Sequence, residues 1–130
     1  MTVMQSQYDQ YDQEFLHHIE CMELRIPVDE TSQKVLGLHA RYWRVDDASA
    51  VRWIRAIGTA TVVSYVEFHR QYAKDFPVPY VVALVELTEG PRLLARLVGI
   101  DGNDVSIGMP LKVSFDERGL AFQADLAVTR

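Results

Sequence analysis

The feature that most constrains the fold is a change of pattern near residue 50. After it, β-branched and aromatic runs alternate with short turn segments, whereas the residues before it are acidic and irregular. The clearest run, residues 60–68, alternates between two sets of side chains, as a half-buried β-strand does. We therefore predict an all-β domain in residues 51–130, preceded by an N-terminal segment in residues 1–50.

Five strands follow from the runs and the turn residues between them: about 51–68, 80–87, 92–100, 111–115 and 120–128. Gly58 interrupts the first and indicates a bulge or sharp bend, by which one strand serves both halves of a small barrel. This mainly β pattern predicts a five-stranded Greek-key OB barrel. An SH3-like barrel or a small sandwich also fits, because only about ten residues separate strands three and four, too few for the usual OB helix.

The N-terminal segment is predicted to begin with an amphipathic helix over residues 8–24. Its apolar stripe consists of Tyr8, Tyr11, Phe15, Ile19 and Met22. The stripe either packs on the protein's own sheet or docks on a partner, and the sequence leaves both open. Pro27 ends the helical pattern. Residues 29–50 read as an irregular linker in which 35–38 and 41–45 form short extended pieces.

The second predicted strand is apolar on both faces. Val81, Ala83, Val85 and Leu87 form one face, and the other consists of Tyr80, Val82 and Leu84. An antiparallel strand with one face in water should alternate more cleanly. The outer face is therefore expected to be covered, either by the N-terminal segment or by another chain.

Charge and composition disfavour several classes of protein. The net charge is −5, and the acidic excess lies in the first 50 residues. A nucleic-acid-binding protein needs basic surface to replace phosphate counterions, so that class is disfavoured. No apolar run reaches the roughly 18–20 residues that cross a bilayer, so no membrane partner is expected. The polar, acidic start lacks the order of a signal peptide, and a cytoplasmic location is expected.

The sequence predicts neither catalytic nor metal-ligating residues. The histidines are His17, His18, His39 and His69. Adjacent histidines on a helix diverge by about 100° and do not readily share a metal ion. No zinc-ligand spacing, nucleophile elbow or glycine-rich phosphate loop occurs either.

A ligand-binding loop is the strongest chemical candidate. Residues 69–77 join the first two barrel strands, a position from which OB folds bind ligands, and place Arg70 and Lys74 among aromatic residues that include Tyr72. Cationic groups can bind phosphates, and aromatic faces can stack on a base. Arg92 and Arg96 share a face of strand three and form a second basic patch. A surface loop of mixed residues without a ligand explains the same pattern.

Three stretches of the barrel resemble the DUF35 family, an OB-fold family associated with acyl-CoA enzymes. They are PYVVALVELTEGPRL at 79–93, IGMPLKVSF at 107–115 and GTATVVSY at 58–65, and the similarity is strongest over residues 53–116. Family members usually carry an N-terminal rubredoxin-like zinc ribbon with two pairs of cysteines. Phe15 and residues 24–27 also resemble the family's entry helix and its lead into the ribbon.

The zinc cysteines of the family are missing here. The first pair would fall around residues 29–32 and the second near Tyr42 and Val45, and these stretches contain no cysteine. The resemblance therefore implies a degenerate zinc-ribbon-like segment in which packing of Tyr42, Trp43 and Val45 replaces the metal. No zinc and no tightly bound cofactor are expected.

The resemblance also implies a function. Family members accompany thiolases, lipid-transfer-type thiolases, hydroxymethylglutaryl-CoA synthase or MaoC-like hydratases. Their OB domain helps to hold CoA, and their helix and ribbon contact the partner. This chain is accordingly expected to be a non-catalytic accessory subunit that binds or positions the CoA moiety of an acyl-CoA for a thiolase-like or MaoC-like hydratase partner. The alternatives are a stand-alone acyl-CoA thioester enzyme or a single-stranded nucleic-acid-binding OB module.

Two sets of site residues follow from these expectations. The CoA-binding set is Arg70, Tyr72, Lys74, Arg92 and Arg96. The partner-interface set is Tyr11, Phe15, Ile19, Met22, Tyr80, Val82 and Leu84. The same apolar surface could pair two copies of the isolated chain.

Overall fold

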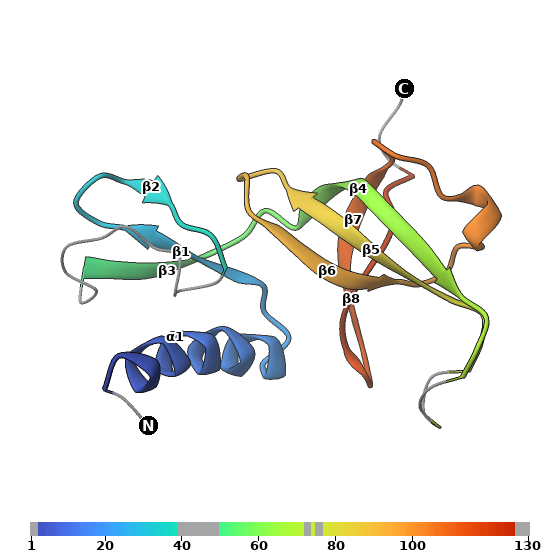
Figure 1. The fold of residues 1–130 in the computed structure, drawn as a ribbon. Coiled ribbons are helices and arrows are strands. Elements are labelled where there is room, and N and C mark those ends of the chain that lie inside the picture. Colours follow the sequence, from blue (N-terminus) through green and yellow to red (C-terminus); the bar gives the residue numbers. More distant parts are fainter. Residues whose placement is uncertain (1–2, 39–49, 72–73, 75–76, 127–130) are drawn as a thin grey trace.

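The computed structural model of the chain describes residues 3–38, 50–71, 74 and 77–126 (Figure 1). An N-terminal helix precedes a small sheet, and a barrel follows. The helix is α1 (Val3–Glu20), and the small sheet consists of β1 (Arg25–Asp29), β2 (Lys34–Val35) and β3 (Val51–Arg55). The barrel consists of β4 (Thr59–Phe68), β5 (Tyr80–Leu87), β6 (Arg92–Leu97), β7 (Pro110–Asp116) and β8 (Gly119–Ala124).

The barrel closes in the order β4-β5-β6-β8-β7, with β7 returning to pair with β4. All neighbours are antiparallel except β6 and β8, which run parallel. This closed five-stranded barrel confirms the OB-fold prediction. The two alternative predictions, an SH3-like barrel and a small sandwich, are not confirmed. A short 3-10 helix, Gly102–Asp104, occupies the connection between β6 and β7, where the sequence leaves too little room for a longer helix.

The barrel core is filled by alternating side chains, as the sequence pattern predicts. Along β5 every second residue is buried, from Val81 to Leu87, and the residues between them are half-buried. Phe122 on β8 and Leu111 on β7 are fully buried. Burying side chains of this size stabilises a fold by about 1.5–3 kcal/mol each.

The prediction of one long strand from about Val51 is wrong. Residues 51–55 form β3, which pairs with β1 in the small sheet, and the barrel begins only at Thr59. Gly58 separates the two strands with φ +97°, a conformation that side chains disfavour. A Cβ at Gly58 would lie 2.9 Å from Cγ1 of Val113 on β7. The bend within β4 is instead a register shift between Val62 and Ser64.

The helix begins and ends earlier than the predicted 8–24. The backbone N–H of Glu23 donates to the carbonyl of His18, and that of Met22 donates to Ile19. Met22 has a left-handed backbone conformation, with φ +62°. This arrangement is a Schellman motif, which ends α1 well before Pro27. No helix among the described residues is long and apolar enough to span a membrane.

The small sheet has the order β2-β1-β3, and part of it lies in the region expected to be irregular. After β1, the Asp29 carboxylate accepts hydrogen bonds from the backbone N–H of Thr31 (3.1 Å) and the hydroxyl of Ser32 (2.9 Å). This turn occupies the position expected for the first cysteine pair. Residues 41–45, including Tyr42, Trp43 and Val45, lie outside the described residues. The division into domains 1–50 and 51–130 stays a prediction.

One apolar cluster joins the small sheet to the barrel. Leu24 and Ile26 belong to the same group of contacting buried side chains as Phe122 and Leu111. Phe15 and Ile19 of α1 pack against this group. The C-terminal half of α1 is therefore fixed to both parts of the molecule, and this contact positions the surface described next.

Candidate functional site

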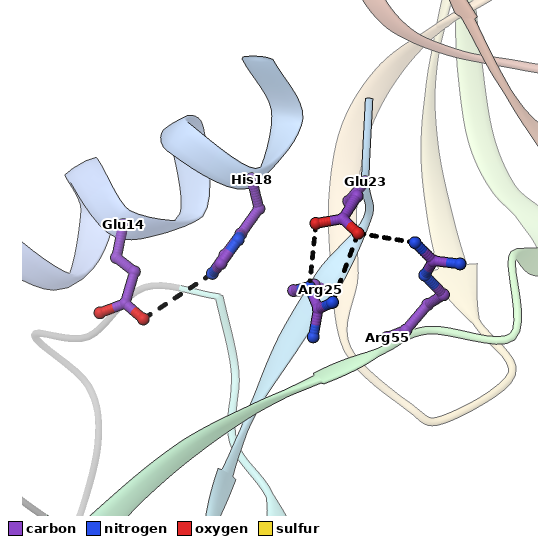
Figure 2. A network of polar contacts seen from close by, with 5 residues as sticks. All are labelled: Glu14, His18, Glu23, Arg25 and Arg55. Carbon is purple, nitrogen blue, oxygen red and sulfur yellow. Dashed lines mark hydrogen bonds and ion pairs between the residues drawn. The ribbon is translucent and has the colours of Figure 1, made fainter. Parts of the chain in front are cut away.

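An ion-pair network holds the end of α1 against the small sheet. Glu23 follows the helix and lies between Arg25 on β1 (3.2 Å) and Arg55 on β3 (2.6 Å), as Figure 2 shows. A hydrogen bond from Arg25, and to a smaller extent one from Arg55, lowers the pKa of Glu23 from 4.5 to about 2. On α1 itself, His18 contacts Glu14 at 3.7 Å and the ring of Trp53 on β3. These contacts set which face of α1 remains open.

The open face of α1 forms one wall of an apolar groove. Its lining from α1 consists of residues one or two turns apart on the helix: Asp12, Phe15, Leu16 and Ile19. The other wall is formed by Leu38 and by the barrel residues Leu93, Leu94 and Leu120. The groove has a volume of about 430 Å³. Among the described residues that line it, Asp12 alone is charged.

The outer face of β4, β5 and β6 continues the apolar surface. The strand register places Val66 opposite Val82, Phe68 opposite Tyr80 and Leu84 opposite Leu94. The rings of Phe68 and Tyr80 stack with centroids 4.9 Å apart. Leu94 is 71% exposed and Val66 is 51% exposed, so the N-terminal segment leaves much of this face open. A second shallow groove on this face shares Leu94 and Leu120 with the first.

Five of the seven residues predicted for a partner interface lie on this surface, and Met22 and Tyr11 lie beside it on α1 or in the turn after it. Phe15 and Ile19 line the helix groove, and Tyr80 and Val82 line the groove on the barrel face. Leu84 lies beside Leu94 through strand pairing. Met22 lines a neighbouring groove on the other side of Leu16 and Ile19, and Tyr11 lies one turn before Phe15. That this surface binds a partner stays a prediction.

Sequence reasoning missed Leu16, Leu94 and Leu120. Leu16 is 55% exposed and lines the grooves on both sides of α1. Its place beside Phe15 and three residues before Ile19 is the signal that would have widened the predicted stripe. Leu94 follows from the alternation of strand three, whereas Leu120 requires the contact between the helix and the barrel.

The basic residues predicted to bind CoA do not form one cluster. Arg92 pairs with Glu86 at 3.0 Å, and Arg96 pairs with Asp116 at 2.7 Å. The hydrogen bond from Arg96 lowers the pKa of the Asp116 carboxyl. Arg92 lies beside Glu86, at the end of β5 away from the β4–β5 loop, and six residues of strand span roughly 20 Å. Arg92 therefore lies far from Arg70.

The β4–β5 loop presents two exposed cationic residues, Arg70 and Lys74. The Gln71 side-chain amide donates a hydrogen bond to the Lys74 carbonyl (3.1 Å). The stacked rings of Phe68 and Tyr80 lie where the two strands enter and leave the loop. Tyr72 lies outside the described residues.

The described residues contain no cluster of side chains that could hold a metal ion. They include no group of three or more His, Cys, Asp or Glu side chains that could hold a metal ion. His69 contacts Glu67 at 3.0 Å and is exposed. Cys21 is exposed in the turn after α1.

Comparison with known proteins identifies relatives of the barrel. Residues 53–116 match the family model for the C-terminal OB-fold domain of ChsH2. The chain is 48% identical over 64 residues to a "Probable enoyl-CoA hydratase alpha subunit" of Thermomonospora curvata, a match that covers 49% of this chain and 20% of the relative. It is 38% identical over 64 residues to a "DUF35 domain-containing scaffold protein" of Methanocaldococcus jannaschii, covering 48% and 45%.

A second hydratase subunit and a solved structure extend the likeness. The "3-oxo-4,17-pregnadiene-20-carboxyl-CoA hydratase alpha subunit" of Mycobacterium tuberculosis is 39% identical over 70 residues, which cover 54% of this chain and 22% of that subunit. The chain thus spans less than half the length of these curated relatives. A chain of the solved "Ltp2-ChsH2(DUF35) aldolase" is 30% identical with a TM-score of 0.77, over 90% of this chain and 94% of that one. Barrel topology, the matched family domain and this shared fold together place the chain in the DUF35 family of OB-fold proteins.

Proposed function

We propose that this chain is a non-catalytic accessory subunit of an acyl-CoA-processing enzyme, with a thiolase-like or MaoC-like hydratase as its partner. The observation that carries the proposal is the continuous apolar surface from α1 across β6 to β5. Leu16 and Leu94 are more than half exposed on it. Large contiguous apolar patches on a protein surface mark interaction sites.

The relatives supply the chemistry of the partner. Two are named as alpha subunits of CoA-ester hydratases, one as a scaffold protein, and the solved neighbour is an aldolase that contains a DUF35 chain. All four names describe either a part of an assembly or a scaffold. A chain with an open apolar face suits the same role.

The CoA moiety is proposed to lie at the β4–β5 loop. Arg70 and Lys74 are the exposed cations there, and the stacked pair of Phe68 and Tyr80 offers an aromatic face beside them. Arg92 and Arg96 take a smaller part, because Arg92 lies far from this loop and both terminal nitrogens of Arg96 bind Asp116. Unchanged CoA affinity of the complex after joint replacement of Arg70 and Lys74 by alanine would remove this assignment.

The accessory role is tested by recovering the complex. The tagged chain, expressed in its own cells, should purify with an acyl-CoA enzyme in a fixed ratio measured by light scattering. The isolated chain should neither hydrolyse nor hydrate acyl-CoA thioesters. Turnover by the isolated chain would show a stand-alone enzyme, and salt-sensitive binding of an oligonucleotide would show a nucleic-acid module. Either result would contradict the proposal.

A further inference from the structure

The segment that contains the groove-lining helix is acidic and has no lysine or arginine to balance its charge. Residues 1–24 contain five Asp or Glu and no Lys or Arg. Two of these carboxylates are engaged within the protein: Glu23 binds Arg25 and Arg55, and Glu14 contacts His18. Those two lie towards the small sheet, as Figure 2 shows.

The remaining described carboxylates of α1 flank the apolar surface. Asp12 lines the groove between α1 and the barrel, and Glu20 lines the neighbouring groove with Leu16, Ile19 and Met22. Both are exposed, and neither forms an ion pair with another described residue. They lie about 12 Å apart along the helix, from the rise per residue. Across the second groove Glu117 adds a negative charge, which Arg118 offsets.

We propose that the groove between α1 and the barrel, with Asp12 in its lining and Glu20 beyond Leu16 and Ile19, receives a segment of a partner protein whose apolar side chains are flanked by lysine or arginine. The inference rests on the proposed accessory function and adds the chemistry of the partner. The leucine-rich lining requires apolar side chains, and Asp12 and Glu20 favour cations at the edges. An anionic lipid surface or a nucleic acid would be repelled by the same two carboxylates.

The apolar positions on α1 fit a protein segment of modest size. Phe15, Leu16 and Ile19, together with the charged Asp12 one turn earlier, span two helical turns, a length of about 10 Å. That length matches two turns of an amphipathic partner helix laid along the groove, a common mode of recognition. Leu94 and Leu120 form the opposite wall, so the inserted side chains would contact both the helix and the barrel.

The test uses the full chain and three labelled synthetic peptides. One is an amphipathic helix of leucine and lysine, the second carries glutamate in place of every lysine, and the third is a scrambled form of the first. Fluorescence anisotropy should detect binding of the first peptide alone, with an affinity that falls as salt is added. Equal binding of the scrambled or the acidic peptide would overturn the inference.

Paired variants locate the binding. Asp12→Asn with Glu20→Gln should weaken binding about three- to tenfold, because exposed ion pairs contribute modestly. The matched control, Asp101→Asn with Asp104→Asn, removes two exposed charges at the 3-10 helix, on the side of the barrel away from α1 (Figure 1).

Leu94→Ser should weaken binding about tenfold or more. Ile107→Ser, at a residue of similar exposure (73%), should leave it unchanged. Equal effects of test and control variants would contradict the inference.

The same variants separate this inference from the accessory role. If the acyl-CoA enzyme purifies with the double Asp12/Glu20 variant as well as with the wild type, the charge complementarity is wrong and the accessory role stands. If the peptide binds as predicted but no acyl-CoA enzyme is recovered with the wild-type chain, the accessory role is wrong and the groove chemistry stands.

Discussion

In the barrel every strand pairs with a neighbour on each side, whereas in the small sheet only the central strand β1 does so. The barrel strands enclose a core centred on residues such as Phe122 and Leu111, which are fully buried. The small sheet instead places Leu24 and Ile26 in the same cluster as the barrel core, and α1 runs along it (Figure 1). The comparison teaches that the barrel supplies its own core, while the N-terminal unit depends on contact with the barrel.

The most damaging change should be a cavity in the barrel core. Replacing Phe122 with alanine removes a fully buried ring and should lower the free energy of unfolding by about 3–5 kcal/mol. Urea unfolding followed by circular dichroism measures the loss. The control, Leu94→Ala, alters an exposed side chain and should cost less than about 0.5 kcal/mol. Similar losses for the two variants would contradict the assigned core.

How much of the fold is readable from the sequence differs between the two regions. The alternation of β5 predicts its bounds, 80–87, and its buried face, because both depend on the strand's own period. The small sheet is harder, because β1 is five residues long, contains Pro27 and pairs with β3 about 25 positions later. Its existence depends on a pairing that no local pattern encodes.

The residues of the candidate site also differ in how far the sequence alone predicts them. Tyr80, Val82 and Leu84 follow from one strand, and Phe15 and Ile19 from one helix, so periodicity finds each group. Their meeting at Leu94 and Leu120 depends on how the end of α1 packs on the barrel. The shared face of Arg92 and Arg96 is likewise a local property. Their pairing with Glu86 and Asp116 follows from neighbouring strands and side-chain geometry.

A milder change tests whether the N-terminal unit depends on the barrel. Ile26 is fully buried in the shared cluster, so Ile26→Val should lower the free energy of unfolding by about 0.5–1.5 kcal/mol. Because the cluster is continuous, we expect a single transition in which Trp53 fluorescence, recorded in a Trp43→Phe background, coincides with circular dichroism from the barrel. An earlier, separate fluorescence transition would show that the two regions unfold independently.

The Glu23 ion pairs give the N-terminal unit a specific dependence on pH. Because folding lowers the pKa of Glu23 from 4.5 to about 2, its stabilising contribution is complete above the unfolded-state value. That contribution is lost as the pH falls from about 4.5 through about 2. The Glu23→Gln variant should therefore be less stable than the wild type at neutral pH, and the difference should shrink across that range. A difference that stays constant down to pH 2 would contradict the network in Figure 2.

The smallest expected effect is that of a zinc chelator. A structural zinc ion supplies on the order of 10 kcal/mol to a small zinc domain, so its removal would unfold the N-terminal unit. Here the turn after β1 is closed by the Asp29 carboxylate, with hydrogen bonds from Thr31 and Ser32, and the sole cysteine, Cys21, lies exposed outside that turn. We therefore expect excess chelator to leave the unfolding midpoint unchanged, as measured through intrinsic tryptophan fluorescence. A lowered midpoint, restored by added zinc, would show that a metal ion and not the shared apolar cluster holds the N-terminal unit.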